Sequence, residues 1–272
     1  MVWASDTQAM IEYQRMRDGY RTVCAWIADN AESQRFVAFL HTGDMVGNGD
    51  TWGQWNLFKE GLALIEEKMP FYWAVGNHDD GYEGNSPWRK QPFATSLPPE
   101  QSYSGGGAHY SFLEVGSVRL LILSIGYKFE LRPGAIEWLR NACMAHSDTP
   151  AILLTHGFLT ADGELMDMAK ELESKVVAAC PNIRLILCGH ARGISRAALT
   201  YDDDGDGETD RTVNVLMYDM QTDKQHYGYI CLLTYDPVQN TLSVNSYSPV
   251  HDDYIYNDDA PGAECFTLEN VF

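Results

Sequence analysis

Acidic, amide and imidazole side chains stand directly after short apolar runs at five points along the chain. They are Asp6 in SDTQ, Asp44 in HTGDMVGNGD, Asn77 and His78 in VGNHDD, His156 in LLTHG, and His190 in LCGHARG. Carboxylate, amide oxygen and imidazole together suit a borderline divalent ion such as Zn, Mn or Fe. Glycines beside these residues permit tight turns and a close approach of the backbone. The pattern therefore predicts a metal site.

The alternative explanation of each residue taken singly is structural. Asp44 alone could cap the following helix, Asn77 alone could form a turn, and a single histidine near a strand end usually makes one structural hydrogen bond. The ordered series of Asp, Gly-Asp, Gly-Asn-His-Asp, His and Gly-His along one chain favours the metal site.

The segments that would position these residues alternate between strand and helix patterns. Short apolar runs predict buried strands at Val2–Ser5, Phe36–His41, Phe71–Val75, Val118–Ser124, Ala151–Thr155 and Arg184–Cys188. Apolar residues at helical spacing predict helices over Asp18–Asn30, Thr51–Lys68, Pro133–His146 and Asp162–Ala179, the last capped by Asp162. This alternation is typical of an α/β fold, in which polar residues at the carboxyl ends of strands meet at one edge of a sheet.

Beyond Gly193 the pattern changes to strands alone, and residues 194–250 are predicted to form antiparallel hairpins of a second sheet. Residues 81–108 form a long insertion rich in Gly, Pro, Ser and aromatic residues, and loops of that length are usually functional or mobile. Its aromatic side chains would either form a wall for an organic leaving group or pack onto the body: Tyr82, Trp88, Phe93 and Tyr103. No linker divides the chain, which predicts a single domain over residues 1–272.

The ordered series resembles the motifs of the calcineurin-like metallophosphoesterase family, from Asp6 through Gly193. The tail YDMQ…GYICLLTYDPVQNTLSVNSYSP is similar to the last strands of members whose first motif is Asp-Thr-Gln. The resemblance implies a four-layer α/β/β/α sandwich and phosphoester hydrolysis at two metals about 3.5 Å apart. It implies that Asp44 bridges the metals, that Asn77, His156 and His190 complete the second site, and that Asp6 belongs to the first. His78 would lie beside the leaving group, oriented by Asp79.

Two departures from the family pattern affect the first metal. Gln8 stands where the family usually has the histidine of Asp-x-His, and Arg192 replaces the second histidine of Gly-His-x-His. Glutamine is a weaker ligand than histidine, and the arginine guanidinium stays protonated and cannot ligate. Arg192 would either grip a phosphate bidentately or form a salt bridge to Asp6. We therefore predict one tightly bound metal, with the first position empty or weakly filled.

The composition limits the partners. The 272 residues carry 19 Lys and Arg against 38 Asp and Glu, for a formal net charge of −19. That acidity argues against nucleic acid as the main partner, and no apolar run is long enough for a membrane span. The start of the chain reads as a truncated strand without a secretory signal, which leaves the compartment open and an extracytoplasmic one possible. The six cysteines show no CxxC pair and predict buried thiols.

An acidic turn at residues 202–210, DDDGDGETD, begins like a calcium-binding loop. Counting from Asp202, the twelfth position is Val213 and not the bidentate Glu that such loops require. A solvated hairpin tip is the alternative interpretation.

The sequence thus favours a metal-dependent phosphoesterase that acts on a small phosphorylated substrate, either a monoester or a diester. The rival hypothesis is a catalytically weak protein that keeps the fold and uses the altered site only to hold a ligand. Gln8 and Arg192 favour the rival, whereas Asp44, Asn77, His78, His156 and His190 favour the enzyme.

Overall fold

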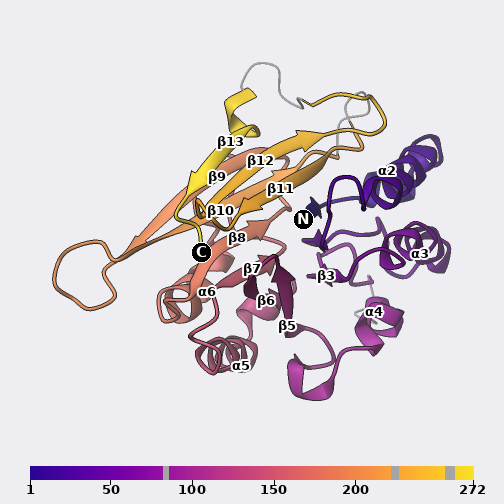
Figure 1. The fold of residues 1–272 in the computed structure, drawn as a ribbon. Helices are drawn as coiled ribbons and strands as arrows, with labels where there is room; N and C mark the ends of the chain where they lie inside the picture. Colours follow the sequence, from indigo (N-terminus) through magenta and orange to yellow (C-terminus); the bar gives the residue numbers. More distant parts are fainter. Residues whose placement is uncertain (82–85, 222–226, 255–260) are drawn as a thin grey trace.

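Two β-sheets pack face to face, and helices cover both outer faces (Figure 1). The computed structural model describes residues 1–81, 86–221, 227–254 and 261–272. Helices α2 (Arg17–Asn30) and α3 (Trp52–Glu66) lie outside one sheet, and α5 (Pro133–Met144) and α6 (Lys170–Leu172) lie outside the other (Figure 1). Apolar side chains such as Trp3, Leu120 and Tyr218 fill the space between the sheets. The predicted four-layer α/β/β/α arrangement is confirmed.

The six-stranded sheet places the first three strands of the chain side by side and parallel. Its order is β13 (Phe266–Glu269), β12 (Thr241–Tyr247), β11 (Ile230–Asp236), β1 (Val2–Ala4), β2 (Phe39–His41) and β3 (Phe71–Trp73). The parallel register aligns Ala4 with His41 and His41 with Trp73. The carboxyl ends of β1, β2 and β3 therefore lie at one edge of the sheet.

The seven-stranded sheet has a parallel centre with antiparallel strands on either side. Its order is β4 (Ser102–Tyr103), β5 (Ala108–Val115), β6 (Val118–Ile125), β7 (Ala151–Thr155), β8 (Ile183–Cys188), β10 (Arg211–Asp219) and β9 (Gly193–Tyr201). Strand β7 is buried along its whole length, as its continuous apolar sequence requires between two parallel neighbours.

The helices are α1 (Gln8–Glu12), α2 (Arg17–Asn30), α3 (Trp52–Glu66), α4 (Pro92–Thr95), α5 (Pro133–Met144) and α6 (Lys170–Leu172). Helix α2 buries Tyr20, Val23, Cys24 and Ile27, a spacing that places them on one face. Pro133 begins α5, where its missing N–H costs nothing. In the described part of the chain, no helix has the length and apolar run that crossing a bilayer would require.

The strands after Gly193 differ from the prediction, because they do not form one second sheet together. Strands β9 and β10 join β8 in the seven-stranded sheet, whereas β11 and β12 pair with β1 in the six-stranded sheet. Strand β5 was not predicted from the sequence; it forms an antiparallel hairpin with β6. Strand β13 was also not predicted.

The helix predicted from Asp162 is wrong at its start. Leu159 pairs with Leu165 as a β-bridge, and Gly163 adopts a φ of 80° in the exposed turn between them. Asp162 therefore lies in this turn and caps no helix. Helical structure begins only at Asp167 and continues through α6 into a π-helical turn, Glu173–Val177.

The aromatic residues of the long insertion mostly pack onto the body. Trp88 is fully buried and Phe93 nearly so, and both rings contact Trp73 at the end of β3. Tyr103 lies against Trp138 of α5. Tyr82 falls outside the described residues. Of the two predicted roles, packing onto the body therefore holds for Trp88, Phe93 and Tyr103, and a wall for a leaving group does not.

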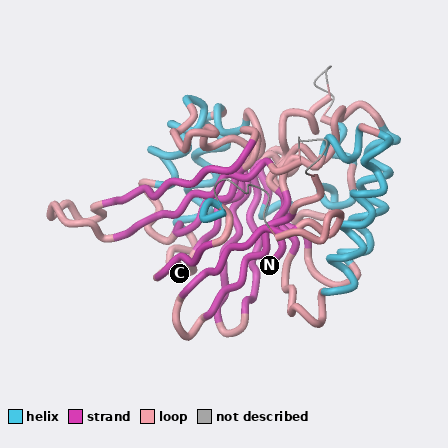
Figure 2. The backbone as a smooth tube through the Cα atoms, turned by 90° about the horizontal axis from the view of Figure 1, so that it is seen from above, coloured by secondary structure: helices cyan, strands magenta, loops and turns pink. Residues whose placement is uncertain are grey.

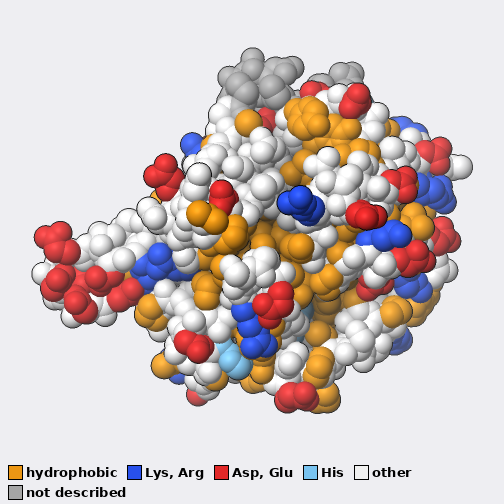
Figure 3. Space-filling view, in the orientation of Figure 1, with side chains coloured by type: hydrophobic (Ala, Val, Ile, Leu, Met, Phe, Trp, Pro, Cys, Tyr) orange, Lys and Arg blue, Asp and Glu red, His pale blue; other side chains and the backbone are white. Residues whose placement is uncertain are grey.

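The β9–β10 hairpin projects from the rest of the molecule (Figure 2). Its tip carries the acidic turn, visible as a red group of side chains (Figure 3). Carboxylate oxygens of Asp202, Asp204 and Asp210 lie within 4.8 Å of one another there, and all three residues are exposed. At the base, Arg211 donates from Nε to Asp203 at 2.7 Å and from Nη2 to the Val177 carbonyl at 2.9 Å. These bonds attach the hairpin to the end of the π-helical turn.

Candidate metal centre

The predicted ligands come from both sheets and meet at the carboxyl ends of their strands. Asp6, Asp44 and Asn77 follow β1, β2 and β3 of the six-stranded sheet. His156 and His190 follow β7 and β8 of the seven-stranded sheet. Ligand atoms of Asp6, Asp44 and His156 lie within 4.8 Å of one another, and all three residues are buried.

Three of these residues leave their strands with left-handed backbone. The φ angles are 56° at Asp6, 53° at Asp44 and 71° at His190. Such angles are uncommon for residues other than glycine and cost of order 1–3 kcal/mol each. Residues held this way cluster at functional sites, where the surrounding structure fixes them.

His156 is at the centre of the cluster. Its Nε2 atom lies 3.3 Å from Asp44 Oδ2, 3.2 Å from Asn77 Oδ1 and 3.2 Å from His190 Nδ1. On the other side of the ring, Nδ1 donates to the Thr42 carbonyl oxygen at 2.8 Å. A histidine held in this way directs the lone pair of Nε2 into the cluster.

The electrostatics of the cluster favour a cation. Burial by itself lowers the pKa of His156, yet the carboxylates of Asp44 and Asp6 raise it to about 10. His190, in contrast, has a pKa lowered to about 4 by burial and by the neighbouring His156. The carboxylates that stabilise a proton on His156 would equally stabilise a metal ion bound to the same nitrogen.

Two oxygens on the Asp6 side of the cluster lack partners. Asp6 Oδ2 accepts bonds from Ser5 Oγ at 2.5 Å and the His190 amide at 3.1 Å, whereas Oδ1 is buried with no hydrogen bond among the described residues. Gln8 Oε1 is likewise buried and unpartnered, while its Nε2 lies 3.5 Å from Asp44 Oδ2. Unpaired buried acceptors are costly, so these two atoms fit a bound divalent ion.

Asp219, the last residue of β10, also lies at this side and was missed by the sequence analysis. It is 2% exposed, and its charge contributes to the raised pKa of Asp6, second only to burial. Burial raises the pKa of Asp219 itself to about 6, against the effect of Arg192. The signal available in the sequence was its position at the end of an apolar run, in the YDMQ that begins the quoted tail.

Arg192 is exposed and makes no salt bridge to Asp6. None of the ion pairs found among the described residues includes it. Its positive charge nevertheless acts to lower the pKa of Asp219. Of the two predicted roles, the salt bridge is wrong, and a role in gripping phosphate stays a prediction.

His78 and Asp79 are not partners, contrary to the prediction that Asp79 orients His78. Nδ1 of His78 lies 2.9 Å from the Gly47 carbonyl oxygen. Asp79 is fully buried and accepts bonds from the backbone amides of Met45, Val46 and Gly76. Asp79 thus fixes the loops after β2 and β3 to each other, and the Gly47 carbonyl orients the imidazole.

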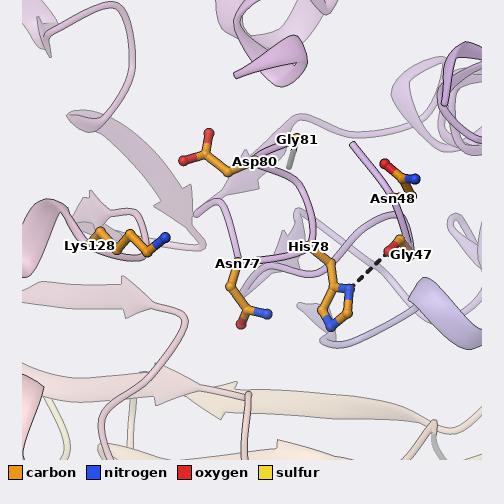
Figure 4. Close-up of a pocket in the computed structure, with 7 residues that line it drawn as sticks. All are labelled: Gly47, Asn48, Asn77, His78, Asp80, Gly81 and Lys128. Carbon is orange, nitrogen blue, oxygen red and sulfur yellow. Dashed lines mark hydrogen bonds between the residues drawn. The ribbon is translucent and has the colours of Figure 1, made fainter. Parts of the chain in front are cut away.

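A pocket of about 380 Å³ opens beside the cluster (Figure 4). Its lining includes Asn77, His78, Asn48, Asp80 and the exposed Lys128. The His78 ring and the Asn77 amide point the same way, away from Asp80 and Gly81, and the amine end of Lys128 is directed toward Asn77 (Figure 4). The pocket therefore has the His78 imidazole and the Lys128 ammonium group next to the candidate metal ligands.

Comparisons with known proteins agree with this architecture. The model of the family described as calcineurin-like phosphoesterase matches residues 2–191. The chain therefore belongs to the calcineurin-like phosphoesterase family. Over 271 residues it is 28% identical to the Bacillus subtilis (strain 168) "Uncharacterized protein YvnB", covering 96% of this chain and 21% of that protein. The chain thus spans about a fifth of the length of this relative.

Solved structures show the same fold at low sequence identity. The purple acid phosphatase PPD1 of yellow lupin (Lupinus luteus) is 13% identical with a TM-score of 0.64, over 98% of this chain and 53% of that chain. A dimetal phosphatase from Danio rerio is 12% identical with a TM-score of 0.60, over 99% and 98%. GAP50, "the anchor in the inner membrane complex of Plasmodium", is 12% identical with a TM-score of 0.59, over 98% and 87%.

Proposed function

We propose that this chain hydrolyses a small phosphorylated substrate, a phosphomonoester or phosphodiester, with the help of a bound divalent metal ion. The observation that supports this most is the convergence of Asp44, Asn77 and His190 on Nε2 of His156, at 3.2–3.3 Å. These are the donors expected of a tight site for Mn, Zn or Fe. When bound, the metal would lower the pKa of a water molecule and so provide a nucleophile at neutral pH.

The residues around the metal position have separate roles in this proposal. His156, His190, Asn77 and Asp44 hold the second metal, and Asp6 and Gln8 face the first position. Because the Gly47 carbonyl can only accept a hydrogen bond, Nδ1 of His78 carries a hydrogen. In the imidazolium form Nε2 carries a proton as well, and this is the proton that the ring would transfer to the leaving oxygen, while Nδ1 keeps its hydrogen.

Positive charge near the pocket supports an anionic substrate despite the formal net charge of −19. Lys128 lines the pocket and is exposed, and Arg192, two residues after His190, is exposed as well. A guanidinium or ammonium group at the mouth would attract phosphate and stabilise its oxygens.

The second candidate is a protein that keeps the fold and binds a ligand with little turnover. Gln8 and Arg192, in place of two imidazoles, favour it. A neighbour with this fold, GAP50, is described as the anchor in the inner membrane complex of Plasmodium.

An activity screen distinguishes the two candidates. Purified protein would be assayed with aryl phosphate monoesters and diesters across Mn, Zn, Fe, Ni and Mg, with metal content measured in parallel. We expect turnover that disappears on metal removal and returns with one metal. Bound metal without turnover on either ester class would favour the binding protein, and absence of metal binding would refute both the metal site and the hydrolysis.

A further inference from the structure

We propose that Asp219 completes the first metal position as an oxygen ligand or charge partner, in place of the missing imidazoles, and makes it a weak site for a hard cation. This inference rests on the proposed function, because it concerns the same metal centre. It adds a residue outside the matched segment, which ends at residue 191.

The register of the sheet brings Asp219 to the level of His190. Strand β10 runs parallel to β8 and pairs Met217 with Cys188, the last residue of β8; Asp219 is two residues beyond Met217, and His190 is two residues beyond the end of β8. On the other side, Asp219 pairs with Gly193 of β9. Asp219 therefore lies between the Gly-His turn after β8 and the start of β9.

Asp6 lies against the same turn. Its Oδ2 accepts the His190 amide at 3.1 Å, and a Cβ placed on Gly189 would come within 2.1 Å of that oxygen. Only glycine leaves room for Asp6 at this point. Asp6 and Asp219 thus approach the Gly-His turn from different sheets, and each carboxylate is affected by the other charges of the site.

Without a cation, the cluster holds three buried carboxyl groups against one fully buried imidazole. Asp6, Asp44 and Asp219 are each at most 2% exposed, whereas His156 is the one fully buried imidazole among the described ligands. The hydrogen bond found for the Asp219 carboxylate, from the Gln221 amide, is long at 3.4 Å. Buried carboxylates are normally paired or bound to metal.

The donor types on this side differ from those around His156. Asp6 Oδ1 and Gln8 Oε1 are buried without partners, and Asp219 adds further carboxylate oxygen. A set made only of oxygen atoms suits Mg²⁺ or Mn²⁺, whereas imidazole nitrogens favour Zn²⁺ and similar ions. The two positions should therefore differ both in affinity and in the ion they prefer.

The test is a titration with Mn²⁺ of the full chain, after chelation and dialysis have removed bound metal. The electron paramagnetic resonance signal of free Mn²⁺ measures how much Mn²⁺ is bound at each step. We expect two equivalents of different affinity in the parent protein, with millimolar Mg²⁺ displacing only the weaker one. Asp219→Asn, which keeps the side-chain shape, should weaken that equivalent at least about tenfold and leave the tighter one unchanged. Glu130→Gln is the matched control, because Glu130 is another fully buried carboxyl influenced by His156, and it should leave both equivalents unchanged.

Thermal unfolding separates a role toward the metal from a purely structural one. Removing a buried, uncompensated charge should raise the Tm of metal-free Asp219→Asn and reduce the increase in Tm that Mn²⁺ produces. Equal loss of Tm with and without Mn²⁺, or parental affinity for both equivalents in Asp219→Asn, would overturn the inference. So would a parent protein that binds one equivalent at every Mn²⁺ concentration, although the proposed function would then stand. A parent protein that binds none would overturn both.

Discussion

Nδ1 of His156 lies 2.8 Å from the carbonyl oxygen of Thr42, although the two residues belong to different sheets. The carbonyl fixes the hydrogen on Nδ1 and leaves Nε2 directed at Asp44 and Asn77. The contact also aligns the end of β7 with the end of β2. The orientation of the central candidate ligand is thus set by backbone before any metal binds.

Replacing either histidine of the second site should remove metal and activity together. We expect His156→Ala and His190→Ala to bind metal more than about 100-fold more weakly, beyond the effect typical of outer-shell groups. Elemental analysis and phosphatase assays of the same samples provide the measurement. His146→Ala is the control, because the His146 ring meets Phe112 edge-on and lies tilted against Tyr110, and it contacts none of the candidate ligands in these ring pairs. Normal metal content and turnover in either site variant would show that the ligand assignment is wrong.

His78 should affect chemistry without affecting metal content. His78→Ala should retain bound metal but lose about 10²–10⁴-fold in rate with substrates whose leaving groups need a proton. The loss should shrink for nitrophenyl esters, because nitrophenolate leaves without protonation. A series of aryl phosphates of graded leaving-group pKa measures this dependence. The same loss across the whole series would exclude His78 as the general acid.

Restoring the two imidazoles should strengthen the first metal position. The double variant Gln8→His with Arg192→His adds two imidazole ligands and removes a guanidinium whose charge would oppose a second dication. We expect dialysed samples to contain close to two metal equivalents, against one for the parent. Two equivalents in the dialysed parent would mean that Gln8 and its neighbours already form a tight site.

Glu130 should make stability depend on pH. Burial raises its pKa from the ordinary 4.5 to about 7, with Lys128 and His156 acting in the opposite direction. The unfolded chain loses this proton near pH 4.5 and the folded chain near pH 7, so folding stability falls as pH rises through that window. The full effect is about 3 kcal/mol.

Glu130→Gln removes this dependence, because glutamine does not titrate. We expect the variant to be more stable than the parent at pH 8, with the difference shrinking toward pH 4.5. Urea unfolding of both proteins at pH 5, 6, 7 and 8 measures the difference. A difference in unfolding free energy that is constant over this range would show that Glu130 titrates normally in the folded chain.

The parts predicted well from the sequence were those where a short apolar run ended in glycine and a polar residue. That pattern located Asp44, Asn77 and His190, because parallel strands bury both faces and deliver their next residues to one edge. Asp219 was missed because β10 is antiparallel to β9 and reads as part of an ordinary hairpin. The helical spacing after Asp162 was misleading, since the Leu159–Leu165 bridge and Gly163 form a turn there. Neither the pairing of β10 with β8 nor this short bridge can be seen from the spacing of apolar residues alone.

The left-handed backbone at Asp6, Asp44 and His190 has a consequence for protein engineering. Grafting the same side chains onto the strand ends of another α/β scaffold would not reproduce the centre, because ordinary strand exits direct side chains elsewhere. A designer would have to transplant the turns with their dihedral angles, including the glycine after β8 that leaves room for Asp6. The backbone of these loops is therefore as necessary to the centre as the side chains that it carries.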